Sequence, residues 1–302
     1  MNINTKVITP TSREHWLELR ANYINSTEVS TLFGLNPYSS KFQLWHEKKS
    51  KVSIGIEENF RMKMGSLLEA PIAQAAADQN GWVIHPMKDY YCDDTLRIGS
   101  SMDYRIENPK AILEIKNVDS LVYKKKWSEF ESTPMIELQV QHQMLLSGYD
   151  TAYICALVGG NELKIIERHA SPEIQKDMLN RVSEFWKSIE DNEEPKIDYE
   201  RDAELLIAIN QMVDPGTFYS GPTDQLEKLV IKYKELGLAE NKIKADKTSL
   251  KAQMMEIIGD KEKVKHEKFS ISLSNIAEQS YTVNKKSYRD FRVFVRGKDE
   301  NL

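Results

Sequence analysis

Glu114 and Lys116 are the two residues whose types and spacing fit a catalytic site most closely. They are separated by one residue in the apolar segment Ala111–Lys116, whose composition is typical of a β-strand. Because successive side chains of a strand point to opposite faces, both charged groups lie on one side while Ile115 points into the core. A carboxylate and an ammonium group are therefore expected side by side on one face of a sheet.

Asp103 provides a second carboxylate. It lies at the end of the strand predicted within Leu96–Ile106, and Asn108-Pro109 is the predicted turn into the next strand. If these two strands pair, Asp103 lies beside Glu114, and two converging carboxylates repel each other unless a cation neutralises them. Such hard oxygen ligands favour Mg²⁺, Mn²⁺ or Ca²⁺ over zinc.

Phosphodiester hydrolysis is the chemistry that fits this arrangement. A bound metal ion polarises the scissile phosphate and supplies a hydroxide. Lys116 beside the metal can position or activate the water and stabilise developing negative charge. Glu69, on the preceding helix behind Gly65, is a candidate third carboxylate. Gln139 lies on the otherwise apolar face of the following helix, where a polar amide needs a partner.

Each of these residues alone also has an ordinary structural interpretation. A Glu-x-Lys pair on a strand is usually a solvated face, Asp103 alone could cap a turn, and Glu69 alone could be a surface charge. Their order, together with the apolar Leu113 and Ile115, favours a site. Competing sites lack support, because the six histidines show no His-x-x-His or His-Glu-x-x-His spacing. The sequence also contains no Walker A loop, Gly-x-Ser-x-Gly elbow or Gly-x-Gly-x-x-Gly loop.

The elements that must position these residues follow from apolar periodicity and from helix start and stop signals. Helices are predicted from Thr11, from Asn25 to about Gly34, after Ser40, over Asn59–Asn80, over Met135–Ser147 and from Ser171 to about Glu190. Strands are predicted over Trp82–Ile84, Leu96–Ile106, Ala111–Lys116, Thr151–Gly159 and Glu162–Glu167, the last two joined by a glycine-rich hairpin turn. This combination predicts an α/β fold.

A change in composition separates a C-terminal part from this core. We predict a nuclease domain over residues 1–200, a linker over 201–221 and an appendage over 222–302. Within the appendage, Thr223–Ile258 predicts a long amphipathic helix that ends at Gly259. The alternating segments Phe269–Ser274 and Tyr281–Val283 predict a short β-hairpin. The helix either docks a partner or another subunit, or folds back on the core.

Composition limits the class of protein. Apolar residues make up 40% and charged residues 29%, as in globular proteins. The net charge of −5 disfavours a uniformly basic, histone-like surface, although a local basic groove is enough to bind phosphates. Two cysteines, Cys92 and Cys155, are too few for a disulfide framework or a four-cysteine metal site, and both are predicted in the core. No membrane span or signal-peptide pattern is found, so a cytoplasmic protein without membrane contact is expected.

Five segments, in the same order, resemble the lambda-exonuclease-like, YqaJ-type phage recombination nucleases of the PD-(D/E)XK superfamily. The segments are Trp16–Arg20 with Ile24–Val29, Met64–Glu69, Ser100–Asp103, Leu113–Lys116 and Gln139–Met144. The resemblance covers about residues 10–190. It implies a PD-(D/E)XK restriction-endonuclease-like core, a central mixed sheet flanked by helices, with the long helix and short hairpin appended. Met102 and Tyr104 replace the proline and glycine usual beside the aspartate, so a differently shaped turn is expected there.

The resemblance also implies roles for the central residues. Asp103, Glu114 and the backbone carbonyl of Ile115 would bind Mg²⁺, for which Mn²⁺ is expected to substitute. Glu69 would reach the metal directly or through water. Lys116 would be catalytic, together with the two carboxylates that hold the metal.

Contacts with DNA are implied at other positions. Gln139 would hold the attacking water or the scissile phosphate. Arg20 and either Ser26 or Thr27 would receive the 5′-terminal phosphate, although Arg20 alone could form a surface salt bridge. A run of three cations just after the catalytic strand could contact backbone phosphate, although such a run is more often an exposed helix segment. These cations are Lys124, Lys125 and Lys126.

Three hypotheses for function follow. The first is a 5′→3′ exonuclease on double-stranded DNA ends that produces 3′ single strands for phage-type homologous recombination. Its expected partners are a single-strand annealing protein and, by the resemblance, further copies of the chain in a trimeric ring. The second is a structure-specific endonuclease on the same core. The third is a catalytically degenerate protein that binds DNA or recruits a partner, against which the intact Asp-Glu-Lys set argues.

Overall fold

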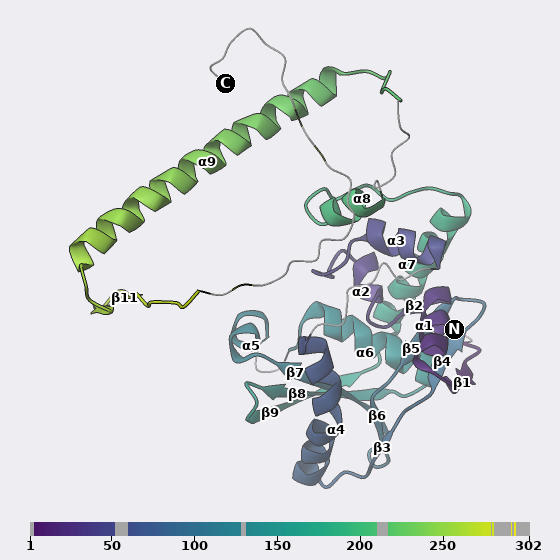
Figure 1. Cartoon of the computed structure of the whole chain (residues 1–302). Helices are drawn as coiled ribbons and strands as arrows, with labels where there is room; N and C mark the ends of the chain where they lie inside the picture. The colour runs from purple at the N-terminus through teal and green to yellow at the C-terminus, as the bar shows by residue number, and fades with distance from the viewer. Residues whose placement is uncertain are drawn as a thin grey trace. The chain divides into compact units, whose positions relative to one another are not determined.

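The chain forms two compact units, Met1–Ile207 and Ala208–Leu302 (Figure 1). This computed structural model describes residues 3–51, 60–127, 131–209, 217–278, 280, 291 and 293. All the candidate catalytic and DNA-binding residues lie in the first unit. The stretch 201–221, predicted as a linker, contains a short helix, α8 (Ala203–Ile209).

A five-stranded mixed sheet is the centre of the first unit. Its order is β3-β6-β7-β8-β9, and only β7 and β8 run parallel to each other. The strands are β3 (Ile84–Pro86), β6 (Tyr104–Ile106), β7 (Ala111–Val118), β8 (Thr151–Val158) and β9 (Glu162–His169). Asn108-Pro109 lies in the turn between β6 and β7, as predicted. The strand β7, which carries Glu114 and Lys116, is therefore the middle strand of the sheet.

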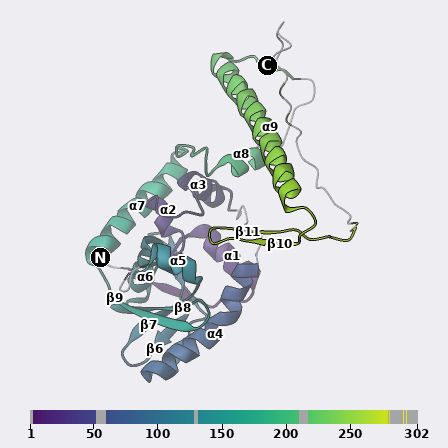
Figure 2. The same ribbon diagram turned by 90° about the vertical axis from the view of Figure 1, so that its left-hand side faces the viewer.

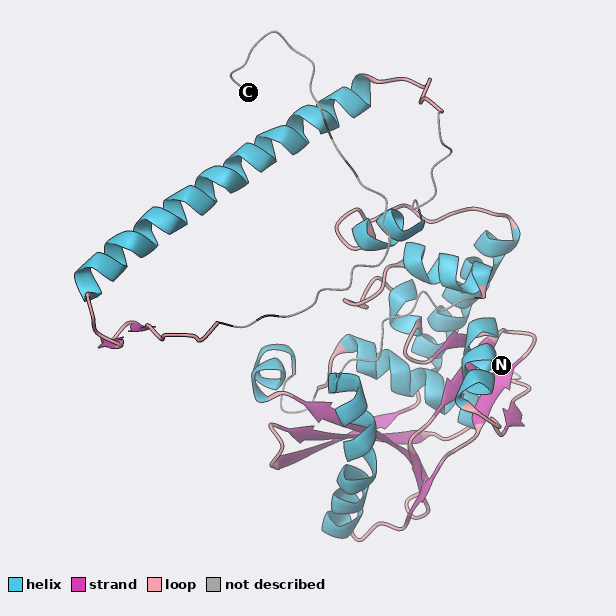
Figure 3. Ribbon diagram, in the orientation of Figure 1, coloured by secondary structure: helices cyan, strands magenta, loops and turns pink. Residues whose placement is uncertain are grey.

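Helices cover both faces of this sheet (Figures 2 and 3). On one face, α4 (Phe60–Asn80) packs Ile72 and Ala76 against Leu113 and Ile115 of β7. On the other face, α6 (Pro134–Ser147) packs against the remaining side chains of β7 and β8. Ile115 thus points into the core while Glu114 and Lys116 face the other way, as the alternation along the strand predicts.

A second, four-stranded sheet lies beside the first. Its order is β1-β4-β5-β2, with β2 parallel to β5 and the other pairs antiparallel. The strands are β1 (Lys6–Ile8), β2 (Ile24–Asn25), β4 (Tyr90–Asp93) and β5 (Ile98–Ser101). Only the segment that forms β5 was predicted as a strand. The other three strands are short, and their partners are distant in the sequence.

The single strand predicted over Leu96–Ile106 is wrong. The chain leaves the four-stranded sheet after Ser101 and enters the five-stranded sheet at Tyr104, so β5 and β6 belong to different sheets. The backbone N–H of Ile115 donates to the Asp103 side chain, at 2.8 Å, and the Asp103 carbonyl accepts from Met87, at 2.9 Å. The turn that holds Asp103 is fixed by these two bonds.

The helices α1 (Arg13–Asn22), α3 (Lys41–Ser50) and α7 (Pro172–Glu190) begin near the predicted positions. The helix predicted from Asn25 begins only at Val29, as α2 (Val29–Leu32), because Ile24-Asn25 pairs with β5 as strand β2. The helix α5 (Ser120–Lys126) was not predicted. The hydroxyls of Ser12, Ser40 and Ser171 cap α1, α3 and α7 by accepting a backbone N–H. Cys92 and Cys155 are buried, as predicted.

Strand β3 begins two residues later than predicted, at Ile84. Gly81 ends α4 in the left-handed conformation, and the N–H of Trp82 still bonds the carbonyl of Ala77 at 2.9 Å. The closing turn of the helix therefore uses the residue predicted as the start of the strand.

No helix in the described ranges is long and apolar enough to cross a membrane.

The second unit contains the predicted long helix, α9 (Asp224–Ile258), which ends at Gly259. It also contains a hairpin of β10 (Lys263–Lys265) and β11 (Ser270–Ser272). The hairpin was predicted, but with Tyr281–Val283 as its second strand. That segment lies outside the described residues, and β11 pairs instead with β10.

His142 of α6 gives the folded chain a specific pH dependence. It is completely buried, and burial lowers its pKa to about 4, against smaller opposing effects of Glu28 and the backbone of Ile24. In the unfolded chain a histidine titrates near pH 6.5. As the pH falls, the unfolded chain takes up this proton first, so the free energy of unfolding decreases between about pH 6.5 and 4.

We predict that His142 contributes roughly 2 kcal/mol to the loss of stability between pH 7 and pH 5. Urea unfolding at the two pH values measures it. A His142→Leu variant should lose less stability over this interval than the wild type does. The matched control is the exposed His169→Leu, which should keep the wild-type pH dependence. Equal slopes for His142→Leu and the wild type would contradict the prediction.

Candidate active site

Glu114 is the buried centre of the site. Its side chain is only 2% exposed, and it faces α6 from the middle strand of the sheet. Gln139 donates to Oε1 at 2.6 Å and Gln143 donates to Oε2 at 2.7 Å. Lys116 Nζ also contacts Oε1. Both carboxylate oxygens are thus bound, which is what a buried carboxylate requires.

Asp103 lies beside Glu114. In the antiparallel ladder between β6 and β7, Tyr104 pairs with Leu113. Asp103 precedes Tyr104 and Glu114 follows Leu113, so Asp103 and Glu114 come together at the end of β6. Burial raises the pKa of the Asp103 carboxyl well above its usual range, and the charge of Glu114 raises it further. Lys116 acts in the opposite direction. The predicted convergence of two carboxylates is present in the structure.

Lys116 and Glu69 complete the charged group. Burial lowers the pKa of Lys116, whereas the carboxylates of Glu114 and Asp103 raise it. The carboxylates have the larger combined effect, so the pKa of Lys116 is raised. Glu69, on α4, is half-buried, and burial and then the charge of Glu114 raise its pKa. The three carboxylates and one ammonium group, all ionised, would leave two negative charges uncompensated. A divalent cation would neutralise this excess.

The donor set fits a hard divalent cation in type. Carboxylate oxygens are the ligands that Mg²⁺ prefers, and Gln143 Oε1 is a buried acceptor with no hydrogen-bond partner among the described residues. Within those residues, no three His, Cys, Asp or Glu side chains already stand in the arrangement of a metal site. Lys116 contacts Oε1 of Glu114, so its ammonium group lies directly beside the carboxylate that would bind the metal.

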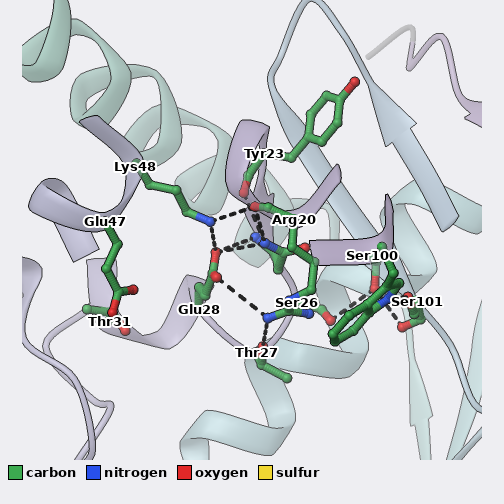
Figure 4. Close-up of polar contacts among 12 residues, drawn as sticks. Arg20, Tyr23, Ser26, Thr27, Glu28, Thr31, Glu47, Lys48, Ser100 and Ser101 are labelled. Atoms are coloured by element: carbon green, nitrogen blue, oxygen red, sulfur yellow. Dashed lines mark hydrogen bonds and ion pairs between the residues drawn. The ribbon is translucent and has the colours of Figure 1, made fainter. Parts of the chain in front are cut away.

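A second cluster surrounds Arg20, at the end of α1 (Figure 4). One guanidinium nitrogen, Nη2, lies 3.1 Å from Thr27 Oγ1, to which it donates, and 3.5 Å from Glu28 Oε1. The guanidinium also stacks on Trp16, 4.7 Å from the ring centroid. Its position is therefore fixed from three sides. The side chain remains 22% exposed, so it is accessible to a ligand.

A buried ion pair supports Arg20 from behind. Lys48 Nζ lies 2.7 Å from Glu28 Oε2 and donates to the carbonyl of Arg20 at 2.8 Å, and its side chain is only 4% exposed. Burial raises the pKa of Glu28, but Lys48 and then Arg20 reverse the effect, so the pKa of Glu28 is lowered. Burial lowers the pKa of Lys48. Glu28 is thus held as a carboxylate between two cations.

The two clusters are joined through β5 and α6. Ser100 donates to the hydroxyl of Ser26 at 2.9 Å, and Trp16 Nε1 donates to the hydroxyl of Ser101 at 2.9 Å. The carbonyl of Ser101 accepts from Gln143 at 3.3 Å, and the same Gln143 amide donates to Glu114. A chain of hydrogen bonds therefore runs from the Arg20 cluster to the buried carboxylate.

The predicted residues differ in where they lie. Five of the predicted residues come together around one point, and the side chain of Gln139 contacts Glu114. The five are Asp103, Glu114, Lys116, Glu69 and Gln139. Arg20 and Thr27 are in contact, whereas Ser26 is buried and bonded to Ser100. The predicted cations of the last turn of α5 are exposed, and no described contact links them to either cluster. These are Lys124, Lys125 and Lys126.

Three contributors were missed by sequence reasoning. Gln143 follows Gln139 by four residues, a spacing that places both amides on one side of a helix, so this signal was available. Glu28 and Lys48 form their ion pair across a sequence separation that no local pattern reveals. Lys48 in particular lies among ordinary surface residues in the sequence.

The domain match covers both clusters. Residues 15–150 match the model of the YqaJ-like viral recombinase domain. The chain is also 30% identical over 178 residues to the uncharacterized protein YqaJ of Bacillus subtilis strain 168. That alignment covers 58% of this chain and 56% of YqaJ. The resemblance to the YqaJ-type branch is confirmed, while the chain spans only about half the length of this relative.

Comparison with solved structures tests the predicted fold. The crystal structure of the alkaline exonuclease LHK-Exo from Laribacter hongkongensis matches with a TM-score of 0.51 and 17% identity, over 64% of this chain and 99% of that one. A phage-related exonuclease from Haemophilus somnus 129PT matches with a TM-score of 0.45 and 12% identity, over 55% and 93%. The match to LHK-Exo confirms the predicted PD-(D/E)XK fold.

Gly99 of β5 keeps the Arg20 cluster in place. It pairs with Asn25 of β2, and the Tyr90 hydroxyl donates to the Asn25 side chain at 2.6 Å. Asn25 in turn donates to Glu28 at 2.9 Å. A Cβ at position 99 would collide with the hydroxyl and ring of Tyr90, both of them buried.

We predict that Gly99→Ala lowers the free energy of unfolding by about 1–3 kcal/mol, because the buried Tyr90 ring must shift. Denaturant unfolding measures the change. The control is Gly65→Ala in α4, where an added Cβ meets nothing within 4 Å. That control should be neutral or should stabilise by up to about 1 kcal/mol. Equal stability of the two variants would show that Tyr90 moves at no cost.

Proposed function

We propose that this chain is a Mg²⁺-dependent exonuclease that degrades double-stranded DNA from its ends in the 5′→3′ direction. The product would be a 3′ single strand for phage-type homologous recombination. The observation that carries the proposal is the hydrogen-bonded connection between the carboxylate–lysine centre and the Arg20 cluster. The first would cut a phosphodiester and the second would hold the phosphate of the end. Both lie within the matched recombinase domain.

Asp103, Glu114 and the carbonyl of Ile115 would hold the Mg²⁺, with Glu69 reaching it directly or through water, and Mn²⁺ would substitute. When bound, the metal polarises the scissile phosphate and supplies a hydroxide. The neighbouring carboxylates hold the Lys116 proton, because they raise its pKa. Lys116 would therefore act as a cation that stabilises the negative charge of the transition state.

Gln139 and Gln143 would act through Glu114. Each amide donates to a different oxygen of the carboxylate, which fixes the plane of the group facing the metal. Positioning by neighbouring hydrogen bonds raises the precision of a metal ligand. We infer that Gln139 orients Glu114 and reaches the attacking water only through that carboxylate.

Arg20 would bind the 5′-terminal phosphate, because a planar guanidinium can make two charge-assisted bonds to phosphate oxygens. Thr27 is exposed and in contact with it, so its hydroxyl would bind the same phosphate. Ser26 would act from behind through Ser100. The exposed cations of α5 would contact the DNA backbone farther from the end. A single-strand annealing protein and a trimeric ring are the proposed partner and assembly.

We predict that the wild-type chain shortens end-labelled linear duplex with Mg²⁺ or Mn²⁺ and loses this activity in EDTA. Lys116→Ala should lower the rate by about 10²–10³-fold, because a charge at the transition state is lost. The matched control is Lys164→Ala. Lys164 also follows a glutamate by two residues on a strand of the same sheet, but it pairs with Glu162 at the surface. That variant should keep wild-type activity.

Covalently closed circular DNA is the second substrate in this experiment. An exonuclease leaves it intact, whereas nicking at a rate similar to that of end digestion would favour the endonuclease alternative. No metal-dependent cleavage of either substrate would favour the degenerate, DNA-binding alternative. Undiminished activity of Lys116→Ala would show that the centre is assigned wrongly.

We predict that Arg20→Ala reduces the preference for 5′-phosphorylated over 5′-hydroxyl ends by about tenfold, because the charge-assisted contact is lost. Digestion rates of duplexes that differ only in this phosphate measure the preference. Arg13→Ala, in the first turn of the same helix, is the control and should retain the preference. An equal loss on both kinds of end would assign Arg20 a structural role.

A further inference from the structure

Helix α9 carries exposed apolar side chains along its length. None of its residues, from Asp224 to Ile258, is buried, and its large aliphatic side chains are about half exposed. Long helices in proteins owe most of their stability to the packing of an apolar face. An exposed apolar face of this length marks an interaction surface. This surface contains none of the residues of the proposed nuclease site.

The apolar residues of α9 repeat every seven positions. One row along the helix contains only aliphatic residues, namely Leu229, Leu236, Ile243, Leu250 and Ile257. Each lies three residues after a member of a second row. A row of this kind is the d position of a heptad, and its neighbour is the a position. Large aliphatic residues at every d position define one continuous side of the helix.

The second row is apolar at its ends and charged at its centre. It contains Leu226, Tyr233, Glu240, Lys247 and Met254. The ring of Tyr233 also contacts Phe291, at 5.9 Å between centroids, and Tyr233 remains 57% exposed. Ten positions therefore follow the alternating three- and four-residue spacing of a coiled coil without interruption. Only two of the ten carry charge.

The opposite side of the helix does not form such a face. At its heptad position, Ile231 and Leu238 are followed by Ala245 and Ala252, so the large side chains stop halfway. The side with continuous large residues is the one formed by the two rows. It is the side that a partner helix would cover.

We propose that α9 pairs with α9 of a second copy of this chain as an antiparallel, two-stranded coiled coil. A heptad face is self-complementary, because the side chains of one copy insert between those of the other. The two charged positions decide the direction of the pairing. They are Glu240 and Lys247, one turn on either side of Ile243.

A parallel pair in register would bring like charges together. Residues at a positions face their own counterparts in a parallel coiled coil, so Glu240 would meet Glu240 and Lys247 would meet Lys247. Like charges in direct opposition within a partly desolvated seam are unfavourable. The sequence of α9 therefore disfavours the parallel arrangement.

An antiparallel pair brings opposite charges together. In the antiparallel alignment that overlaps all ten positions, Glu240 of one copy lies level with Ile243 of the second copy. Lys247 of the second copy lies about 6 Å from that level along the helix axis. Helix side chains lean toward their own N-terminus, so these two groups lean toward each other. The symmetry of the pair forms this contact twice. The charges thus become a device for direction and register.

The ends of the same alignment are entirely apolar. Leu226 lies level with Ile257 of the second copy, Leu229 with Met254, and Tyr233 with Leu250. Three apolar layers therefore flank the charged centre on each side. The apolar side chains of the two rows, which are exposed in the single chain, all enter this seam.

The first test uses two substitutions two residues apart. Leu236 and Leu238 are similarly exposed, 57% and 50%, but only Leu236 lies on the proposed seam. In light scattering at micromolar concentration, the full-length wild type and Leu238→Glu should have twice the mass of Leu236→Glu. The ratio is the readout, because assembly through the first unit does not change it. Circular dichroism checks that the variants remain folded.

The second test exchanges the central charges. Glu240→Lys and Lys247→Glu should each weaken the pairing by about tenfold, and the double exchange should restore it to within about threefold. Glu240 also pairs with Lys244 of its own helix, at 2.6 Å. That contact is lost in Glu240→Lys and in the double exchange but kept in Lys247→Glu, so the recovery of the double exchange relative to Glu240→Lys reports the contact between copies.

Three results would overturn the proposal. The first is that the wild type has the same mass as Leu236→Glu. The second is that Leu236→Glu and Leu238→Glu have the same mass. The third is that the double exchange pairs as weakly as the single variants. The first would leave another protein, or another part of the chain, as the cover of this face. The third result would favour a parallel pair. Digestion of linear DNA by a Leu236→Glu variant is a separate readout, so failure of the nuclease proposal is recognised independently.

Discussion

The desolvated carboxylate of Glu114 is the constraint on which the site depends. A carboxylate that is buried in the middle of a sheet is strongly unfavourable unless each oxygen is bound. Two amides from α6 and the ammonium group of Lys116 meet this requirement. The apolar packing of α6 on the sheet therefore has a second consequence, because it fixes the distance at which Gln139 and Gln143 reach Glu114. The position of the Glu114 carboxylate and the stability of the core follow from the same contact.

The bend at Met102-Asp103 has a comparable importance. It passes the chain from one sheet to the other, and it leaves Asp103 between them rather than within a strand. Ser100 and Ser101, just before the bend, bond to the Arg20 cluster, while Asp103 itself bonds the catalytic strand. One short segment thus sets the separation between the buried carboxylates and the Arg20 cluster.

Sequence reasoning identified the parts of the molecule with local signals. Helices with a capping serine and apolar periodicity, such as α7, were predicted nearly to the residue, and the face of Glu114 followed from simple alternation. The strands β1, β2 and β4 were missed, because two to four residues carry no periodicity and their pairing is non-local. The break between β5 and β6 was missed because both halves have strand composition. Lys48 was missed because only tertiary structure brings it to Glu28.

The contrast between two similar pairs shows what makes a charged motif a site. Glu114 and Lys116 lie on β7, and Glu162 and Lys164 lie on β9, with the same spacing in the same sheet. The glutamate of the first pair is 2% exposed and that of the second 57%. On the edge strand, water screens the pair, and it carries little energy. On the middle strand, covered by helices on both faces, Glu114 raises the pKa of Lys116, and the charges of Glu114 and Lys116 both act on the pKa of Asp103. The motif becomes chemically significant through the position of its strand, which the spacing of its residues does not encode.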